Sequence, residues 1–165
     1  MLPEYVVAID PGTTESGICI VRVSDYKPIQ FAKIKNENVG AWVFENFQKP
    51  YRLVIEMVAS YGMPVGKEVF ETCVWIGRFI EQVMLPHHGY EFIYRQEEKL
   101  TLCHSPKAND ATIRQSLVDR FAYGQTNHGK GTKRSPGWFY GFSKDVWQSY
   151  ATAVTAIDKH KGLKK

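Results

Sequence analysis

The stretch VVAIDPGTTESGICI, residues 6–20, decides the fold, because it holds two apolar runs joined by a short turn. The first run ends in one acid, Asp10, and Gly12 and Gly17 bracket the turn that follows. Apolar runs of this length, bounded by turn residues, are typical of strands. We therefore expect an antiparallel pair of strands at residues 5–10 and 17–23, with an acid at the end of the first.

The composition is that of a soluble globular protein, with 44% hydrophobic and 23% charged residues in 165. We expect a single domain over residues 1–165, since this length suits one core. We see no apolar run long enough to span a membrane and no secretory signal. Three widely spaced cysteines, Cys19, Cys73 and Cys103, predict buried free thiols and a cytoplasmic location rather than a disulfide framework.

The rest of the chain alternates between strand and helix patterns. We expect strands at 28–34, 51–58 and 91–94, and helices at 39–47, from Ser105-Pro106 onward and from about Lys144 to Lys159. At residues 95–103 we expect only a turn of helix, and at residues 122–141 we expect a long loop. Three antiparallel strands followed by α/β units predict a mixed five-stranded α/β sheet with helices on both faces.

The longest helical pattern covers residues 66–84, and its apolar residues extend around much of the circumference. Such a helix needs two neighbours, of which one could be the sheet and the other a partner subunit. Gly77 would let a facing helix approach closely, and that helix could belong to a partner subunit. The residues that we assign to this interface are Phe70, Val74, Gly77 and Ile80.

Three acids stand out by position. Asp10 ends the first strand, Glu56 lies in the other strongly apolar strand, and Asp145 begins the last helix. An acid buried without a partner is costly, so two in the most apolar strands suggest a shared cation. Carboxylate oxygens suit Mg²⁺ or Mn²⁺. A pair of such ions about 4 Å apart can activate a water and stabilise a leaving oxygen in phosphodiester hydrolysis.

Basic residues dominate the chain from Lys130 onward, which suits a polyanionic partner. Asp145 and Asp158 are the acids there, and the basic residues include the terminal Lys164 and Lys165. The alternative is a solvated basic face. Our candidates for phosphate contact are Lys107, Arg114, Lys130, Lys133 and Arg134. Trp138, Phe139 and Tyr140 fit core packing beneath the loop better than a stacking surface.

An ordered set of motifs resembles the RuvC-type Holliday-junction resolvases, above all their phage-encoded branch. The set comprises IDPG at the first strand, VIE at residues 54–56, a long helix, and Asp145 at the head of the last helix. IRQSLVDRF (113–121) and PGWFYGFSKD (136–145) resemble the phage branch in particular. The resemblance implies a ribonuclease H-like fold, a homodimer, and Mg²⁺-dependent nicking of branched DNA, with Mn²⁺ as a substitute and a role in recombination or in clearing branches before packaging.

The resemblance assigns Asp10, Glu56 and Asp145 as catalytic, metal-binding acids. A fourth acid is usual three residues after the third, and here that position is Gln148. An amide oxygen can coordinate a metal but brings no charge, so one or two ions per subunit both remain open. Asp110 could compensate, although a helix cap suits it better. Tyr61 is placed where it could stack on a DNA base or simply pack.

Two other functions fit parts of the sequence. The segment IDPGTTESG also resembles the first phosphate loop of actin-like ATPases, but 165 residues leave no room for the second domain that such an enzyme needs. We therefore expect no nucleotide cofactor. The second alternative is a junction-binding protein with weak or no cleavage, which Gln148 suggests.

Overall fold

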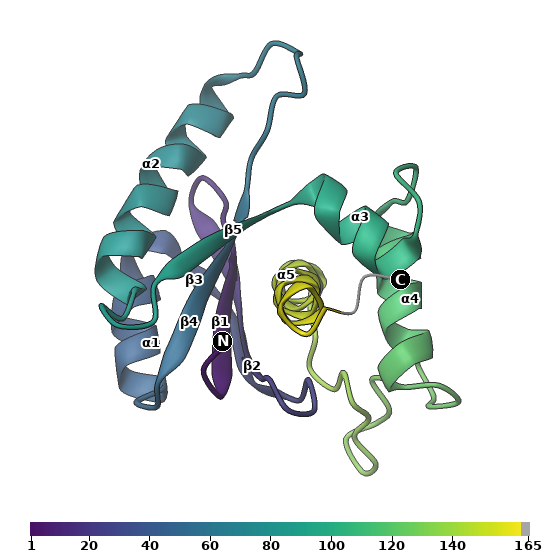
Figure 1. Cartoon of the computed structure of the whole chain (residues 1–165). Coiled ribbons are helices and arrows are strands. Elements are labelled where there is room, and N and C mark those ends of the chain that lie inside the picture. Colours follow the sequence, from purple (N-terminus) through teal and green to yellow (C-terminus); the bar gives the residue numbers. More distant parts are fainter. Residues whose placement is uncertain (163–165) are drawn as a thin grey trace.

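A five-stranded mixed sheet forms the centre of the computed structural model, which describes residues 1–162 (Figure 1). Its strand order is β3-β2-β1-β4-β5. The first three strands are antiparallel, whereas β4 runs parallel to β1 and β5 parallel to β4. The predicted α/β sheet is confirmed, with bounds within two residues of those expected. The strands are β1 (Tyr5–Asp10), β2 (Glu15–Arg22), β3 (Pro28–Lys35), β4 (Tyr51–Met57) and β5 (Tyr90–Tyr94).

Helices cover both faces of the sheet (Figure 1). On one face lie α1 (Val39–Asn46), which follows a short 3-10 turn at Asn36–Asn38, and α2 (Lys67–Val83). On the other face α5 (Lys144–His160) packs directly on the sheet. Beyond α5 lie α3 (Arg95–Cys103) and α4 (Asp110–Phe121), so α5 is enclosed between the sheet and this outer pair.

The alternation of side chains along β1 produces two separate cores. Val6 and Ala8 face α5, whereas Val7 and Ile9 face α1 and α2. This is the period of two that a strand imposes. Helix α5 is buried from Ser149 to Asp158, which is why it carries small and apolar residues almost all the way round.

Two helices differ from the prediction. Residues 95–103 form a full helix rather than a single turn, because its inner side packs against α4 and α5. The next helix begins at Asp110 and not at Ser105-Pro106. Asn109 is its cap, since its side chain accepts a hydrogen bond from the backbone of Thr112 at 3.0 Å. The cap role suggested for Asp110 is therefore wrong.

The apolar residues of α2 divide between two sides. Ile76, Phe79 and Val83 are buried against the sheet. Phe70 and Val74 point outward, with 63% and 57% of their surface exposed. The sheet is thus one of the two neighbours that the sequence pattern requires.

The connection between α4 and α5 is compact rather than structureless. Gly131 and Pro136 form an isolated bridge. Phe139 is fully buried and Trp138 stacks on Phe121 at 5.6 Å, as expected for core packing. Tyr140 differs from that expectation, since it is 44% exposed.

The remaining expectations concern thiols, membrane spans and the terminal lysines. Cys19 is buried, but Cys73 and Cys103 are only half-buried, because they lie on helix sides that the core does not fully cover; all three are free thiols. Within residues 1–162 no helix has the length and apolarity needed to cross a bilayer. Lys164 and Lys165 lie outside the described residues.

Candidate active site

The ends of β1 and β4 bring two of the predicted acids together. These strands are parallel and in register at Ile9 and Ile55, so Asp10 and Glu56 follow at the same level. Both side chains lie on the face that α5 covers, since they continue the alternation of Ala8 and Val54. A buried strand that ends in an acid thus has a second acid beside it.

The third acid reaches this point because a glycine lets α5 approach the sheet. Gly17 is the partner of Asp10 in the β1–β2 register. A Cβ atom added to Gly17 would lie 2.3 Å from the carbonyl oxygen of Asp145 and 3.0 Å from its Cβ atom. The backbone of Asp145 therefore occupies the space that any other residue at position 17 would fill. The structure brings the three predicted acids to one end of the sheet.

The surroundings of Asp10 and Glu56 disfavour their ionised forms. Burial, followed by the charges of Asp145 and Glu98, raises the pKa of Asp10 from 3.8 to about 7. Burial and the charge of Asp10 raise the pKa of Glu56 from 4.5 to about 8. The two carboxyls interact directly, and this interaction lowers the pKa of Asp10 and raises that of Glu56. Carboxyls this close share a proton unless a cation neutralises them.

A divalent cation fits these residues, although no coordination geometry is preformed. Among residues 1–162 no three His, Cys, Asp or Glu side chains are arranged to hold a metal ion. The reason is that the acids have other partners: Asp10 and Glu56 bind each other, and Asp145 lies 3.0 Å from Lys33. A divalent cation that displaced the proton of Asp10 and Glu56, and the ammonium group of Lys33 from Asp145, would meet carboxylate oxygens of all three acids. Such oxygen donors are the ligands that Mg²⁺ and Mn²⁺ prefer.

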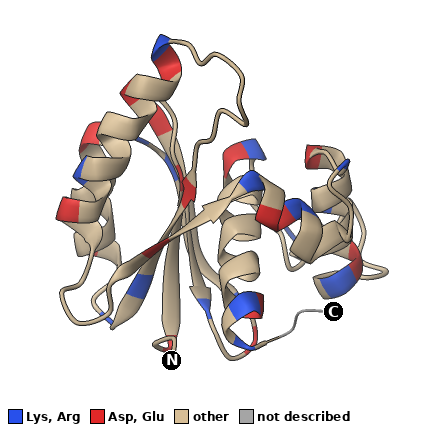
Figure 2. Cartoon of the chain, turned by 45° about the horizontal axis from the view of Figure 1, so that its top comes forward, with Lys and Arg blue, Asp and Glu red and all other residues tan. Residues whose placement is uncertain are grey.

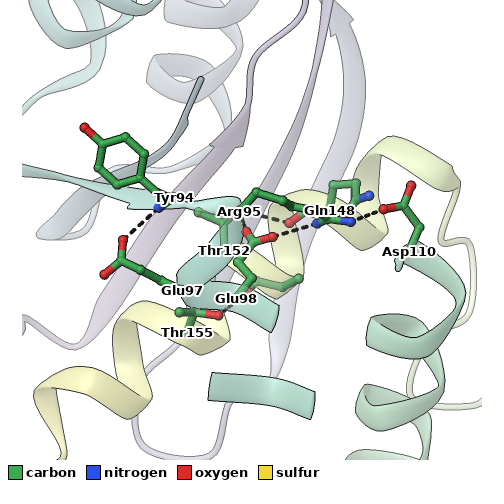
Figure 3. Close-up of polar contacts among 9 residues, drawn as sticks. Tyr94, Arg95, Glu97, Glu98, Asp110, Gln148, Thr152 and Thr155 are labelled. Carbon is green, nitrogen blue, oxygen red and sulfur yellow. Dashed lines mark hydrogen bonds and ion pairs between the residues drawn. The ribbon is translucent and has the colours of Figure 1, made fainter. Parts of the chain in front are cut away.

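A second cluster of charged residues is centred on Arg95 (Figure 3), whose charge also acts on Asp10 and Glu56. Arg95 donates to Glu98 at 2.6 Å and to Gln148 at 2.7 Å, and it also donates to Asp110. Glu98 is wholly buried and accepts a second hydrogen bond from Thr152 at 2.7 Å. Burial raises the pKa of Glu98 to about 8, and the hydrogen bonds from Thr152 and Arg95 oppose that rise.

Arg95, Glu98 and Lys33 carry only weak signals in the sequence, and none of them was predicted as a site residue. In the sequence, Arg95 and Glu98 are an ordinary pair three residues apart on a short helix. Only the packing of α3 on α5 buries Glu98. The usable signal is Thr152, a polar residue on the inner face of α5. Lys33 is one of several polar residues on β3, and only the fold places it beside Asp145.

Basic residues line two adjoining hollows next to this cluster. The first has a volume of about 280 Å³ and is lined by Gln148, Lys144 and Arg114 among others. The second, of about 340 Å³, is lined by Arg114 and Lys130 together with His128. Arg114 and Trp147 line both hollows. Two predicted DNA contacts, Arg114 and Lys130, thus lie on a path that begins beside Gln148, and Lys144 belongs to the same path.

The other predicted DNA contacts are solvent-exposed and lie elsewhere on this surface. Lys107 lies between α3 and α4, and Lys133 and Arg134 are at the tip of the turn closed by Gly131 and Pro136. Within the described chain, none of the five basic candidates forms an ion pair with an acid. Tyr61, in the loop between β4 and α2 that follows Glu56 along the chain, is 64% exposed.

The residues predicted for a dimer interface lie along α2. Phe70 and Val74 are exposed, and a Cβ atom added to Gly77 would meet nothing within 4 Å. Ile80 is half-buried and packs against the protein's own core. Acidic and basic side chains alternate with these residues along α2 (Figure 2).

The described structure has the ribonuclease H-like fold that the resemblance implied. Two solved structures of Thermus thermophilus RuvC match it over 96% of both chains. One has a TM-score of 0.64 at 17% sequence identity; the other, solved in complex with a Holliday junction substrate, has a TM-score of 0.67 at 14%. No protein-family model and no curated protein matches the chain. At these identities the likeness establishes the fold.

Proposed function

We propose that the protein is a metal-dependent endonuclease that binds branched DNA, such as Holliday junctions, forks and flaps, and nicks it by phosphodiester hydrolysis. The observation that carries the proposal is the convergence of Asp10, Glu56 and Asp145 at one end of the sheet, where burial raises the pKa of the first two. The RuvC-like fold supports the same class of reaction.

The three acids would act together in the proposed reaction, as the ligands of one divalent ion. When bound, Mg²⁺ or Mn²⁺ supplies the activation of the attacking water and the stabilisation of the leaving 3′-oxygen. Asp10 and Glu56 hold this ion from two rigid strands, which fixes its position better than loop residues would. Asp145 completes the set from α5. Lys33, which is 44% exposed and also lies 3.4 Å from Glu15, would then leave Asp145 and be available to contact a DNA phosphate.

The DNA would follow the basic hollows away from the acids. Lys144 and Arg114 line the first hollow, and Arg114 and Lys130 line the second. These side chains neutralise phosphates without reading bases, so the affinity should fall steeply as the salt concentration rises. Lys107, Lys133, Arg134 and Tyr61 remain proposed contacts with more distant arms of a branched substrate.

A homodimer would give the enzyme two identical sites for two strands. The exposed face of α2 supports this proposal, because Phe70, Val74 and Gly77 lie on one side of the helix at helical spacing. We expect Phe70→Glu to convert a dimer into a monomer in light scattering, because a charge would be buried in the interface. Phe44→Glu is the matched control, since Phe44 is 71% exposed on α1. A wild-type monomer, or a dimeric Phe70→Glu variant, would contradict the assignment.

The phage-like segments 113–121 and 136–145 motivate a role in recombination or in removing branches before genome packaging. The proposed location is the cytoplasm of the host cell. Both proposals follow the resemblance of these segments.

Cleavage of a panel of labelled DNAs tests the proposed function. The panel holds a four-way junction, a three-way fork, a flap and a linear duplex of the same length, each with Mg²⁺ or Mn²⁺. We expect nicks near the branch point in the branched substrates and little cleavage of the duplex. Equal cleavage of the linear duplex would contradict the selectivity for branches.

A second candidate is a junction-binding protein that does not cleave. Gln148 favours it, because that amide accepts from Arg95 and adds no charge for a metal. Tight binding of the four-way junction without nicks, at enzyme excess, would support this alternative. The remote ATPase alternative is weakened by the turn after β1: the amide of Gly12 donates to Ser16 at 3.2 Å, and its carbonyl accepts from Asn36 at 2.8 Å. That amide is therefore not free for a phosphate.

A further inference from the structure

Beside the three acids lies a second set of oxygen atoms, and the guanidinium of Arg95 occupies the space among them. The set comprises carboxylate oxygens of Glu98 and Asp110 and the amide oxygen of Gln148, which come from α3, α4 and α5. Two carboxylates and an amide are donors that a hard divalent cation also accepts. Here the guanidinium of Arg95 lies among them and donates to all three (Figure 3).

The Arg95 cluster lies next to the proposed metal ligands. Gln148 follows Asp145 by three residues on α5, so both lie on the same side of that helix. Arg95 follows directly on β5, where Ile93 is the register partner of Glu56. The two oxygen sets therefore occupy neighbouring positions at one end of the sheet.

Arg95 is held firmly in this position. Its side chain is only 20% exposed, and its partner Glu98 is wholly buried and fixed by Thr152 at 2.7 Å. A guanidinium presents its donors in a rigid planar fork, and hydrogen bonds between charged groups are the strong ones. A metal ion could use Gln148 and Glu98 only after expelling Arg95 and breaking these bonds.

We propose that Arg95 takes the place of a second divalent ion, so that each subunit binds one ion, held by Asp10, Glu56 and Asp145. This inference rests on the proposed metal-dependent function. It also explains Gln148: an amide oxygen accepts from the guanidinium without adding a charge that would attract another metal.

The number of bound ions tests this inference without measuring activity. Mn²⁺ is titrated into the protein and followed by calorimetry and by electron paramagnetic resonance, in which two ions about 4 Å apart give a coupled spectrum. We expect one ion per chain in the wild type and in Gln148→Asp, because Arg95 neutralises the new carboxylate. Arg95→Gln combined with Gln148→Asp should bind two ions. Arg78→Gln, an exposed arginine on α2, is the control and should bind one.

Two ions in the wild type or in Gln148→Asp would overturn the inference, and so would a single ion in a folded double variant. Circular dichroism shows whether the double variant folds; the other two proteins retain Arg95 and decide the question if it does not. A four-way junction assay on the same samples separates the two proposals. A wild type that binds two ions and cleaves refutes the inference alone, whereas one that binds no ion and does not cleave refutes the proposed function as well.

Discussion

The molecule holds two acidic clusters at the same end of its sheet, and they are neutralised in different ways. Glu98 and Asp110 share the guanidinium of Arg95. Among residues 1–162 neither Asp10 nor Glu56 forms an ion pair, and burial raises the pKa of both, although the charge of Arg95 opposes the rise. The difference distinguishes a cluster that contains its own cation from one that requires a cation from solution. We therefore assign the first to structure and the second to chemistry.

The largest expected effect is the loss of cleavage when one of the three acids that would bind the metal is replaced. Asp10→Asn, Glu56→Gln or Asp145→Asn should each slow single-turnover nicking of a four-way junction about 10³-fold, since a metal contributes several kcal/mol to the transition state. Junction binding should persist in gel-shift assays, because the basic path is unchanged. Glu45→Gln, an exposed acid on α1, is the control. A variant that cut at the wild-type rate would show that its acid is misassigned.

The Arg95 cluster should instead respond in stability. Arg95→Gln leaves Glu98 buried without its main partner, so we expect the free energy of unfolding to fall by about 3 kcal/mol in urea melts. Arg114→Gln is the matched control and should change it by less than about 0.5 kcal/mol, because Arg114 is exposed. If both variants were equally stable, the cluster would not have the structural role that we assign to it.

The positions of the two clusters could be predicted from the sequence to different extents. Asp10 and Glu56 interrupt apolar strands, and Asp145 begins an amphipathic helix, so local patterns sufficed to find them. The mixed sheet, with three antiparallel strands followed by parallel ones, was predicted from the same patterns, whereas the strand order came from the structure. Glu98 could not be found in this way, because a glutamate three residues after an arginine is typical of a solvent-exposed helix. Its burial depends on α3 packing against α5, which is a tertiary contact.

The boundary errors have similar physical causes. In the sequence, Val74 and Ile76 belong to one wide apolar face of α2. Only the packed structure shows that Ile76 is buried against the sheet and that Val74 is exposed. The start of α4 was misplaced because Ser105-Pro106 is a strong helix-start signal, whereas Asn109 makes the capping hydrogen bond. Local signals compete, and tertiary packing selects among them.

A smaller effect should follow from disturbing the contact that places Asp145. Gly17→Ala puts a methyl group against the Asp145 backbone, where the added carbon would lie 2.3 Å from the carbonyl oxygen. We expect a loss of about 1–3 kcal/mol in stability and weaker Mn²⁺ binding, because the start of α5 must move. Gly77→Ala, which meets nothing within 4 Å, should be neutral or stabilising by about 0.5–1 kcal/mol. Unchanged Mn²⁺ affinity in Gly17→Ala would argue that Asp145 is not a ligand.

The smallest effect is a pH dependence of stability that metal removes. The folded-state pKa values of Asp10 and Glu56 are raised to about 7 and about 8, so the folded protein holds protons that the unfolded chain has lost. The metal-free protein should therefore lose stability as the pH rises from about 5 to about 8, with a melting temperature lower by several degrees. Saturating Mn²⁺ should make the curve shallower, as should Asp10→Asn combined with Glu56→Gln, while the raised pKa of Glu98 keeps part of the slope. A rise in stability over this range would contradict the shared proton.

The most direct test of the account is the metal dependence of junction cleavage by the wild-type protein. A labelled four-way junction is incubated with excess protein in EDTA, in Mg²⁺ and in Mn²⁺, and both binding and nicking are measured in each sample. We predict binding in all three conditions and nicks near the branch point only with a divalent ion. Binding with metal present and no nicks would contradict the assignment of Asp10, Glu56 and Asp145 as a catalytic metal site.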